Sequence, residues 1–336
     1  LVTAPLAIVG AVGNVVNIRT FFSMGVSDGV SVSLAWQAAS DLLFLVSVVI
    51  SSAAIALHGF EKISEYTFWC PVDPEAVSLV FNNTGSGSYA ITMLVTTYVT
   101  GVRCLSVARP LRFRNFPALK KTTLVLSVFT SLCIASVIAL LVFVGVSPNF
   151  DTKLNATRPI LWISPQRKVT KDIIFGLRDA FLPFVSQILV SLCVVVMATS
   201  LREASHFRQK YSSQIALKNR TPNTSAHTSI VRDPLQKMNT VTLAAEPQTA
   251  RGKSSTKLTG KDLQVVRQML VIASVYWVCN VPKTAFNLTT IIFTDFNKGG
   301  RYEALYTTTN FLRQLIQVFN AGVGIFIYWN FNSRFR

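Results

Sequence analysis

The sequence predicts an all-α membrane protein: a bundle of seven transmembrane helices with a short amphipathic helix at its C-terminal end. Half of the 336 residues are hydrophobic and only 14% are charged, whereas a soluble domain usually carries about 25% charged residues. The mean hydropathy is +0.43. Long apolar runs recur along the chain, and a run of about 20 apolar residues is enough to cross a bilayer. The lipid bilayer is therefore the expected surrounding of this fold.

Seven apolar runs give the domain organisation, with residues 1–336 forming one seven-transmembrane domain. We place the spans at residues 2–22, 32–57, 78–107, 122–146, 173–200, 264–294 and 303–329. Between the fifth and sixth spans, residues 202–261 are rich in Ser, Thr, Lys and Gln and contain three prolines. Such a composition cannot bury a core, so this inner loop is expected to be mostly disordered.

Basic residues predict how the chain is oriented in the membrane. The formal net charge is +17, but the basic residues fall in a few loops, which favours membrane orientation over binding to nucleic acid. The 107–121 loop carries five Lys/Arg and no acid, and residues 202–261 carry eleven Lys/Arg against three acids. Both loops are predicted to face the cytoplasm by the positive-inside rule. The N-terminus and the 147–172 loop then lie outside, although that loop is also basic, and Asn155 in it begins a glycosylation sequon.

Polar residues recur inside the predicted spans, where each is costly unless it faces the bundle interior. Asp41 lies in the middle of the second span and indicates a functional site, with a structural hydrogen-bond hub as the alternative; Asn14 is placed to face it. One face of the seventh span is polar or small: Asn310, Arg313, Gln314, Gln317, Asn320, Gly324 and Tyr328. The sixth span has a similar face: Tyr276, Asn280, Lys283, Thr284 and Asn287. Pro282 and Pro183 are expected to kink their helices.

Charged residues gather in the outer halves of the last three spans. Arg178 and Asp179 are adjacent in sequence and should point in different directions on a helix, so Lys283 or Arg313 is the expected partner of Asp179. This leaves a surplus of positive charge, which favours a pocket for an anionic group such as a carboxylate. The alternative is that these side chains extend outward to lipid headgroups.

Six motifs stand in an order, and on spans, that are typical of one receptor family. They are Gly13-Asn14, Ser40-Asp41-Leu42-Leu43, Arg103 with Pro110 and Leu111, Pro183, Cys279 with Pro282, and Tyr328 followed by Asn332, Phe335 and Arg336. Together they resemble the rhodopsin-like (class A) G-protein-coupled receptors over essentially the whole chain apart from the long inner loop. Residues 97–114 are most similar to divergent invertebrate peptide or chemosensory receptors.

This resemblance implies a multi-pass receptor of the plasma membrane that binds an extracellular peptide or small ligand and activates a heterotrimeric G protein. Coupling and activation would involve Arg103, Pro110, Pro282 and Tyr328. A central polar site, which binds sodium in many relatives, would consist of Asn14, Asp41, Thr92 and Asn320. The ligand pocket would be lined by Tyr89, Asp179, Asn280, Lys283, Asn287, Arg313 and Gln314. No other cofactor is expected than a sodium ion near Asp41.

The chain also departs from the family pattern. Val102 stands where an acid normally precedes the third-helix arginine, Asn280 replaces the sixth-helix tryptophan, and Gly324-Ile325 replaces the seventh-helix Asn-Pro. Cys70 lies earlier than the expected third-helix cysteine, and the 147–172 loop contains no cysteine. The usual outer disulfide therefore has no evident pair, and the resemblance implies a divergent receptor.

Other classes of protein fit the sequence less well. An enzyme is not expected, because no Ser/His/Asp, metal or nucleotide-binding motif appears and the chain has only three histidines. A light sensor would carry a lysine in the seventh span, and residues 303–329 contain none. An amine receptor would usually carry an acid on the outer third helix, where Gly85 and Ser86 stand. The alternative that stays open is a transporter or channel that uses Asp41 and the polar helix faces as an ion path.

Overall fold

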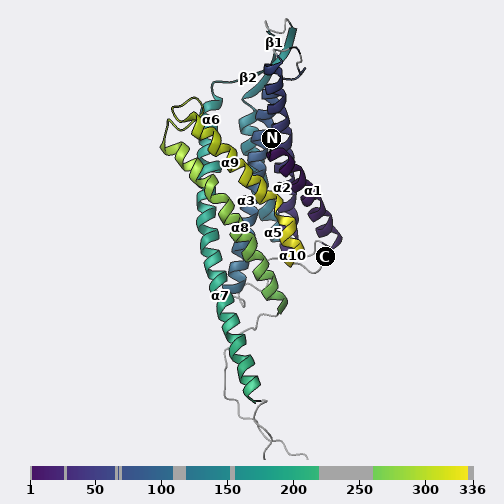
Figure 1. Ribbon diagram of the computed structural model, residues 1–336, viewed down its shortest axis with the longest axis vertical. Helices are drawn as coiled ribbons and strands as arrows, with labels where there is room; N and C mark the ends of the chain where they lie inside the picture. The colour runs from purple at the N-terminus through teal and green to yellow at the C-terminus, as the bar shows by residue number, and fades with distance from the viewer. Residues whose placement is uncertain are drawn as a thin grey trace, which may run out of the picture.

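The computed structural model describes residues 2–25, 29–64, 67, 70–108, 119–151, 156–218 and 260–331. Seven helices in these ranges are long and apolar enough to cross a membrane, and they lie side by side in one bundle (Figure 1). Such a set of helices indicates a multi-pass membrane protein, because helices satisfy all of their backbone hydrogen bonds internally. The predicted helical bundle is confirmed to this extent.

The first four helices overlap the first four predicted spans, with ends that differ by up to six residues. They are α1 (Thr3–Ser23), α2 (Gly29–Ile63), α3 (Pro74–Ala108) and α5 (Leu119–Leu141). Of these, α3 is the central helix: 56% of its most apolar 18-residue stretch is buried, against 17% for the corresponding stretch of α5. The hydroxyl-rich sequence of α3 therefore packs against other helices, whereas the almost wholly apolar α5 offers most of its surface to lipid.

The last three spans are built from more than three helical segments. These are α6 (Arg167–Ile174), η1 (Phe175–Phe181), α7 (Leu182–Lys218), α8 (Gly260–Ile292), α9 (Glu303–Gly322) and α10 (Gly324–Phe331). The segment η1 is a π-helical stretch that joins α6 to α7. Pro282 lies inside α8, and the helix continues on both sides of it. The predicted C-terminal amphipathic helix falls on residues outside the described ranges.

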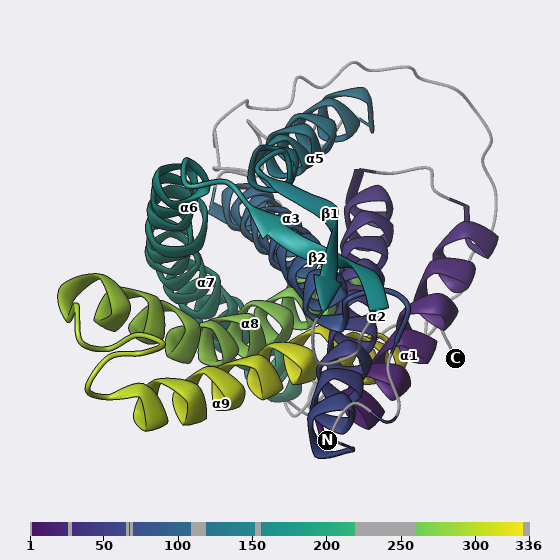
Figure 2. The ribbon, with the colours of Figure 1, turned by 90° about the horizontal axis from the view of Figure 1, so that it is seen from above.

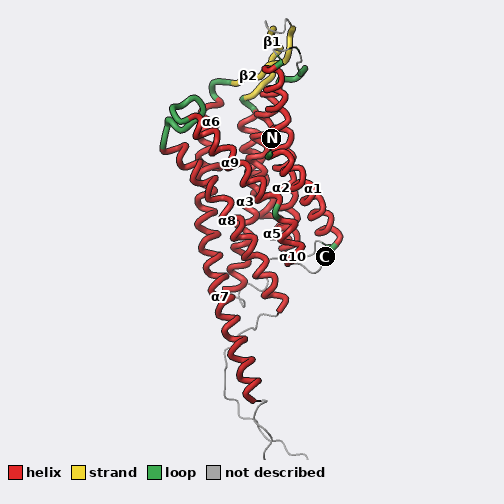
Figure 3. Tube along the Cα trace, in the orientation of Figure 1, coloured by secondary structure: helices red, strands yellow, loops and turns green. Residues whose placement is uncertain are grey.

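A β-hairpin at one end of the bundle corrects the all-α prediction. Strand β1 (Val144–Asp151) pairs antiparallel with β2 (Ala156–Ile163), with Val146 opposite Leu161. The fourth span was predicted to run to residue 146, but α5 ends at Leu141. The sequence from Val142 to Val146 consists of Val, Phe and Gly, residues that suit a strand as well as an apolar helix end. Figure 3 shows the two strands beyond the helices, and we call this end of the bundle the hairpin end.

Part of the 202–261 segment, which was predicted to be mostly disordered, is helical. Helix α7 continues as far as Lys218, and it projects beyond the other helices at the end opposite the hairpin (Figure 1). Residues 202–218 contain many good helix formers and no Gly or Pro, so the helix has no reason to stop at the membrane boundary. The average composition of residues 202–261 concealed the difference between this helix-forming part and the remainder of the segment. Residues 219–259 lie outside the described ranges.

A close approach of two helices brings the first and last spans together. A β-carbon added at Gly10 of α1 would lie 3.1 Å from the α-carbon of Gly322 in α9. Small residues at such a crossing allow two backbones to pack closely within a membrane. Because α1 and α9 meet here, Asn14 can reach across to the C-terminal end of α9.

Candidate functional site

Polar side chains inside the bundle form two groups at different depths. We call Asn14, Asp41, Thr92 and Asn320 the central layer. We call Arg178, Asp179, Lys283, Asn287 and Arg313 the outer layer. The outer layer lies nearer the hairpin end, because its partner Ser86 precedes Thr92 on α3, which begins at that end.

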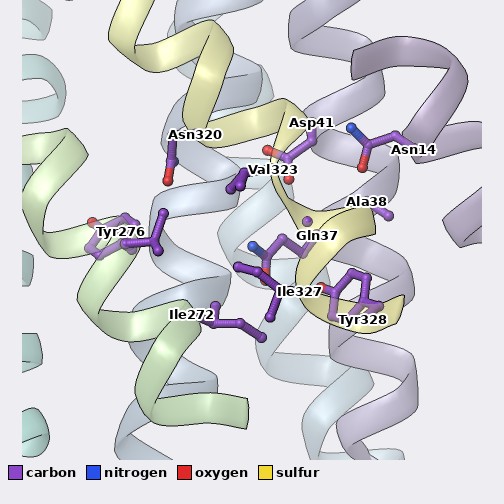
Figure 4. Close-up of a pocket in the computed structure, with 12 residues that line it drawn as sticks. Asn14, Gln37, Ala38, Asp41, Ile272, Tyr276, Asn320, Val323, Ile327 and Tyr328 are labelled. Carbon is purple, nitrogen blue, oxygen red and sulfur yellow. The ribbon is translucent and has the colours of Figure 1, made fainter. Parts of the chain in front are cut away.

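Asp41 is the buried acid of the central layer. Its side chain belongs to α2 and is only 5% exposed. The hydroxyl of Thr92 on α3 donates a hydrogen bond of 2.8 Å to the Asp41 carboxylate. Asp41 also lines a cavity whose walls include Asn14, Asn320 and Tyr328 (Figure 4). A carboxylate beside a cavity keeps acceptor capacity that its protein partner does not use.

Asn14 connects α1 to the end of α9 rather than to Asp41. Its amide donates hydrogen bonds of 2.8 Å to the carbonyl of Ala321 and 3.1 Å to the carbonyl of Gly10. Asn17 donates to the Asn14 side-chain oxygen at 3.5 Å. Asn14 and Asp41 therefore share a cavity wall without a direct hydrogen bond, which leaves the space between them open.

The central cavity fits a small hard cation by its donors and its size. The space that the centre of a water molecule can occupy in this cavity is about 20 Å³. This volume is enough for at least one water molecule. Asp41, Asn14 and Asn320 bring one carboxylate and two amide oxygens to its walls, and hard cations prefer oxygen ligands. These three residues would hold a sodium ion, which would neutralise the Asp41 charge. Within the described ranges, no three His, Cys, Asp or Glu side chains are placed to hold a metal.

Tyr89 of α3 joins three helices between the two layers. Its hydroxyl donates to the Asn280 side-chain oxygen of α8 at 3.0 Å and accepts from the Asn320 amide of α9 at 3.3 Å. Asn280 in turn donates to the Tyr276 carbonyl at 2.9 Å. The Tyr89 ring packs on Phe44 of α2 with their centroids 5.1 Å apart. A shift of Tyr89 would therefore alter its contacts with α2, α8 and α9.

An ion pair within η1 corrects the predicted pairing in the outer layer. Arg178 and Asp179 bind each other, with an N–O distance of 2.9 Å, and both are buried. Ser136 of α5 and Ser86 of α3 accept hydrogen bonds from the Arg178 guanidinium at 3.0 and 3.2 Å. Ser86 also donates to Asp179 at 2.9 Å. The long arginine side chain folds back along a π-helical turn, where the α-helical spacing used in the prediction does not apply.

Asn287 of α8 compensates for the proline that follows η1. Pro183 has no N–H to donate to the carbonyl of Asp179 four residues earlier. The Asn287 amide donates to this same carbonyl. A neighbouring helix thus satisfies a backbone group that the proline leaves free, as membrane helices require. Pro183, where a kink was predicted, lies in α7 two residues after the end of η1.

Lys283 and Arg313 supply the surplus positive charge of the outer layer. Lys283 is 2% exposed, and its ammonium lies 4.6 Å from the centroid of the Tyr89 ring. Within the described residues, no carboxylate lies within ion-pair distance of it. Arg313 is half-buried, donates to Asn310 at 2.7 and 3.2 Å, and lies over the Phe286 ring. The nearest partners of both cations are thus neutral, and the Asp179 carboxylate attracts them from beyond ion-pair distance.

The described residues among those predicted for coupling come from three different helices. Arg103 is half-buried near the end of α3 that is remote from the hairpin. Tyr328 of α10 is buried, packs edge-on against Phe21 of α1 and lines the central cavity. Pro282 lies in α8. Pro110 and the sequon residue Asn155 fall outside the described ranges. Gln314 is half-buried and, in the part of the chain that is described, makes no hydrogen bond to either layer.

Several residues of the two layers did not stand out in the sequence. Ser86 and Ser136 hold Arg178, and Gln37 lines the central cavity one helical turn before Asp41. A serine in a membrane helix commonly bonds its own backbone, so its sequence position does not show that it meets an arginine from another helix. For Gln37 a signal was present, because positions four apart share one helix face.

Comparison with protein-family models found no match, and a search of curated proteins found no similar sequence. The class that the helices define is that of a multi-pass membrane protein. The two polar layers and the sequence motifs that contain their residues are the basis for the function proposed below.

Proposed function

We propose that this chain is a rhodopsin-like G-protein-coupled receptor, which binds an extracellular peptide or small ligand with an anionic group and activates a heterotrimeric G protein. The observation that carries the proposal is the position of Tyr89, whose hydroxyl joins α8 to α9 between a positively charged outer layer and the Asp41 site. A chain of buried polar contacts from one layer to the other is what a ligand-driven switch requires.

The proposed orientation places the hairpin end and the N-terminus outside the cell, with the protein in the plasma membrane. The basic loop around residues 107–121 then faces the cytoplasm, in accord with the positive-inside rule. Arg103 lies next to this loop, where it would contact the G protein. The outer layer then lies in the half of the bundle that faces the outside, although Lys283 and Asn287 are buried there.

An anionic group on the ligand would bind Lys283 and Arg313. Asp179 is already neutralised by Arg178, so the two remaining cations have no carboxylate of their own within the described residues. A buried cation held only by neutral partners is costly, and an incoming carboxylate would relieve this cost. The alternative, an outward extension to lipid headgroups, does not suit Lys283, which is buried with its ammonium over the face of the Tyr89 ring.

Activation would be a shift between two packings of the bundle. A ligand can shift this equilibrium only by its difference in affinity for the two states. An anion that draws the Lys283 ammonium away from Tyr89 would weaken the contact that holds the ring. The hydrogen bonds of Tyr89 to Asn280 and Asn320 could then rearrange, and α8 would move relative to α3 and α9.

The test is G-protein activation in cells that express the chain, across a panel of acidic peptides and small carboxylates. Arg103→Ala is the matched control, because this position contacts the G protein and lies far from the outer layer. A response to a ligand that is lost in Arg103→Ala at equal surface expression supports the proposal. A response that is unchanged by Arg103→Ala contradicts it.

The second candidate is a transporter or channel. The observation in its favour is the buried Asp41 carboxylate on a cavity that can hold water. Uptake of labelled sodium or of acidic substrates in the same cells separates the two candidates. Flux that is lost in Asp41→Asn, without any G-protein response, would favour the transporter or channel.

A further inference from the structure

The start of α3 is organised by one buried carboxylate, that of Asp73. An Asp before a Pro is a typical helix start, because the Asp side chain caps the helix and proline suits its first position. Here one Asp73 oxygen accepts the backbone N–H of Glu75 at 2.9 Å. Asp73 is only 6% exposed, which is more burial than capping alone requires.

The other oxygen of the same carboxylate reaches the β-hairpin. It accepts the backbone N–H of Leu161 in β2 at 3.1 Å. This N–H is not needed for pairing with β1, because in an antiparallel ladder alternate residues point their N–H groups outward. Asp73 therefore joins two elements that lie 88 residues apart in the sequence. Seen from above, the hairpin crosses over α3 (Figure 2).

No covalent link performs this task. All five cysteines of the chain are free thiols, and none of them lies in residues 147–172. The backbone N–H of Cys70, the cysteine nearest to the start of α3, donates to the buried Glu61 carboxylate at 2.7 Å. A two-stranded hairpin is marginally stable by itself in water, so its position over the bundle depends on contacts such as the one with Asp73.

We propose that Asp73 is a positioning residue: its carboxylate holds the hairpin over the outer mouth of the bundle where a covalent link is absent, and so maintains the ligand site. The part that concerns the ligand rests on the proposed receptor function. The part that concerns the hairpin does not.

Asparagine at position 73 separates the hairpin contact from helix capping. Asn is as good an N-cap as Asp, so Asp73→Asn keeps the hydrogen bond from Glu75. Its amide nitrogen is a donor, however, and would face the Leu161 N–H, which is also a donor. Leu161→Pro removes the same hydrogen bond from the other side, at an outward-facing position where proline is tolerated. Glu75→Gln is the matched control, because Glu75 is an exposed acid on the same helical turn.

The experiment is hydrogen–deuterium exchange of the full chain in lipid nanodiscs, followed by mass spectrometry. Asp73→Asn should speed exchange of residues 144–163 about tenfold, since a hydrogen bond to a charged group is among the stronger ones. Exchange at the start of α3 should stay unchanged, as should the hairpin in Glu75→Gln. Adding Asp73→Asn to Leu161→Pro should give no further increase. Unchanged hairpin exchange in Asp73→Asn overturns the proposal, and so does an equal increase at the start of α3.

Ligand response is measured on the same variants. A fall in potency of about tenfold in both Asp73→Asn and Leu161→Pro, with Glu75→Gln unchanged, is expected if the hairpin maintains the ligand site. Unchanged potency beside faster hairpin exchange would overturn the functional part while leaving the structural part standing. If no ligand activates the unaltered chain, the receptor function fails, and the exchange data still decide the role of Asp73.

Discussion

The two polar layers of the bundle solve the problem of a buried charge in opposite ways. In the outer layer the carboxylate of Asp179 has an arginine beside it, and two serines complete the hydrogen bonds of that pair. In the central layer the Asp41 carboxylate has one hydroxyl donor and a cavity. One acid is therefore compensated within the protein, whereas the other has space for a partner from outside.

The ionisable groups that remain in the two layers also differ in kind. Lys283 and Arg313 remain in the outer layer after Arg178 and Asp179 are paired, and Asp41 gives the central layer a carboxyl group. A closed ion pair is a fixed structural element, whereas a buried ionisable group without an ion-pair partner is stabilised by a ligand of opposite charge. This difference accords with the proposed anion site near the hairpin and the proposed cation site at the centre, with Tyr89 between them.

The largest expected effect comes from breaking the closed pair. Arg178→Met should lower the free energy of unfolding by about 3–5 kcal/mol, because it leaves a buried carboxylate without its counter-ion. The double variant Arg178→Met with Asp179→Asn should recover most of this loss. Unfolding temperatures in detergent measure both. Lys168→Met, at an exposed position, is the control, and its unfolding temperature should change little. A double variant as unstable as the single variant would show that the two charges act separately.

The next effect tests whether the central layer takes a cation. Sodium at 10–100 times its dissociation constant should stabilise the unaltered protein by about 1.4–2.7 kcal/mol relative to a large organic cation at equal ionic strength. In Asp41→Asn this gain should disappear, although the amide oxygen still accepts the Thr92 hydrogen bond. Thermal unfolding in the two salts gives the comparison. Asp172→Asn, an exposed acid, should keep the full sodium effect, and a sodium gain retained in Asp41→Asn would count against this site.

A smaller effect, of opposite sign, is expected at Lys283. Lys283→Met should raise the free energy of unfolding by about 1–2 kcal/mol, since it removes a buried cation that has no counter-ion in the described part of the chain. The potency of an anionic ligand should fall in the same variant, so that stability and response change in opposite directions. Dose–response curves and unfolding temperatures measure the two. Lys298→Met, which is exposed, should alter neither; loss of stability in Lys283→Met would mean that the ammonium is already compensated.

The spans were predictable because twenty-residue apolar runs carry one clear signal. The hairpin was not, since an apolar count does not separate the end of a lipid-facing helix from a Val-rich strand. The helical residues 202–218 were hidden by the composition of the longer segment. The spacing and the content of apolar residues thus predicted which segments form the membrane-spanning helices. They predicted the ends of the helices and strands poorly.

Within the site, residues on one helix face were predictable and contacts between helices were not. The polar face of α9 turns inward, with Gln317 buried and Phe311 exposed, as its spacing of three and four residues implies. The partner of Asp179 was predicted incorrectly because that inference assumed α-helical geometry at η1. Ser136 could not have been found from spacing at all, since it meets Arg178 from 42 residues away.

The smallest change tests whether the two layers act together. Tyr89→Phe removes one hydroxyl that serves Asn280 and Asn320, and it should cost about 1 kcal/mol of stability. The larger consequence should be on the coupling between the two sites. If sodium changes the affinity of an anionic ligand, thermodynamic linkage requires the ligand to change the affinity of sodium by the same factor.

In Tyr89→Phe both changes in affinity should diminish together, because the aromatic ring remains and only the link to α8 and α9 is lost. Titrating the ligand with and without sodium measures this, and Phe44→Leu, which repacks the ring without touching the hydroxyl, is the matched control. Coupling that survives in Tyr89→Phe would mean that the layers communicate through helix packing rather than through this hydroxyl.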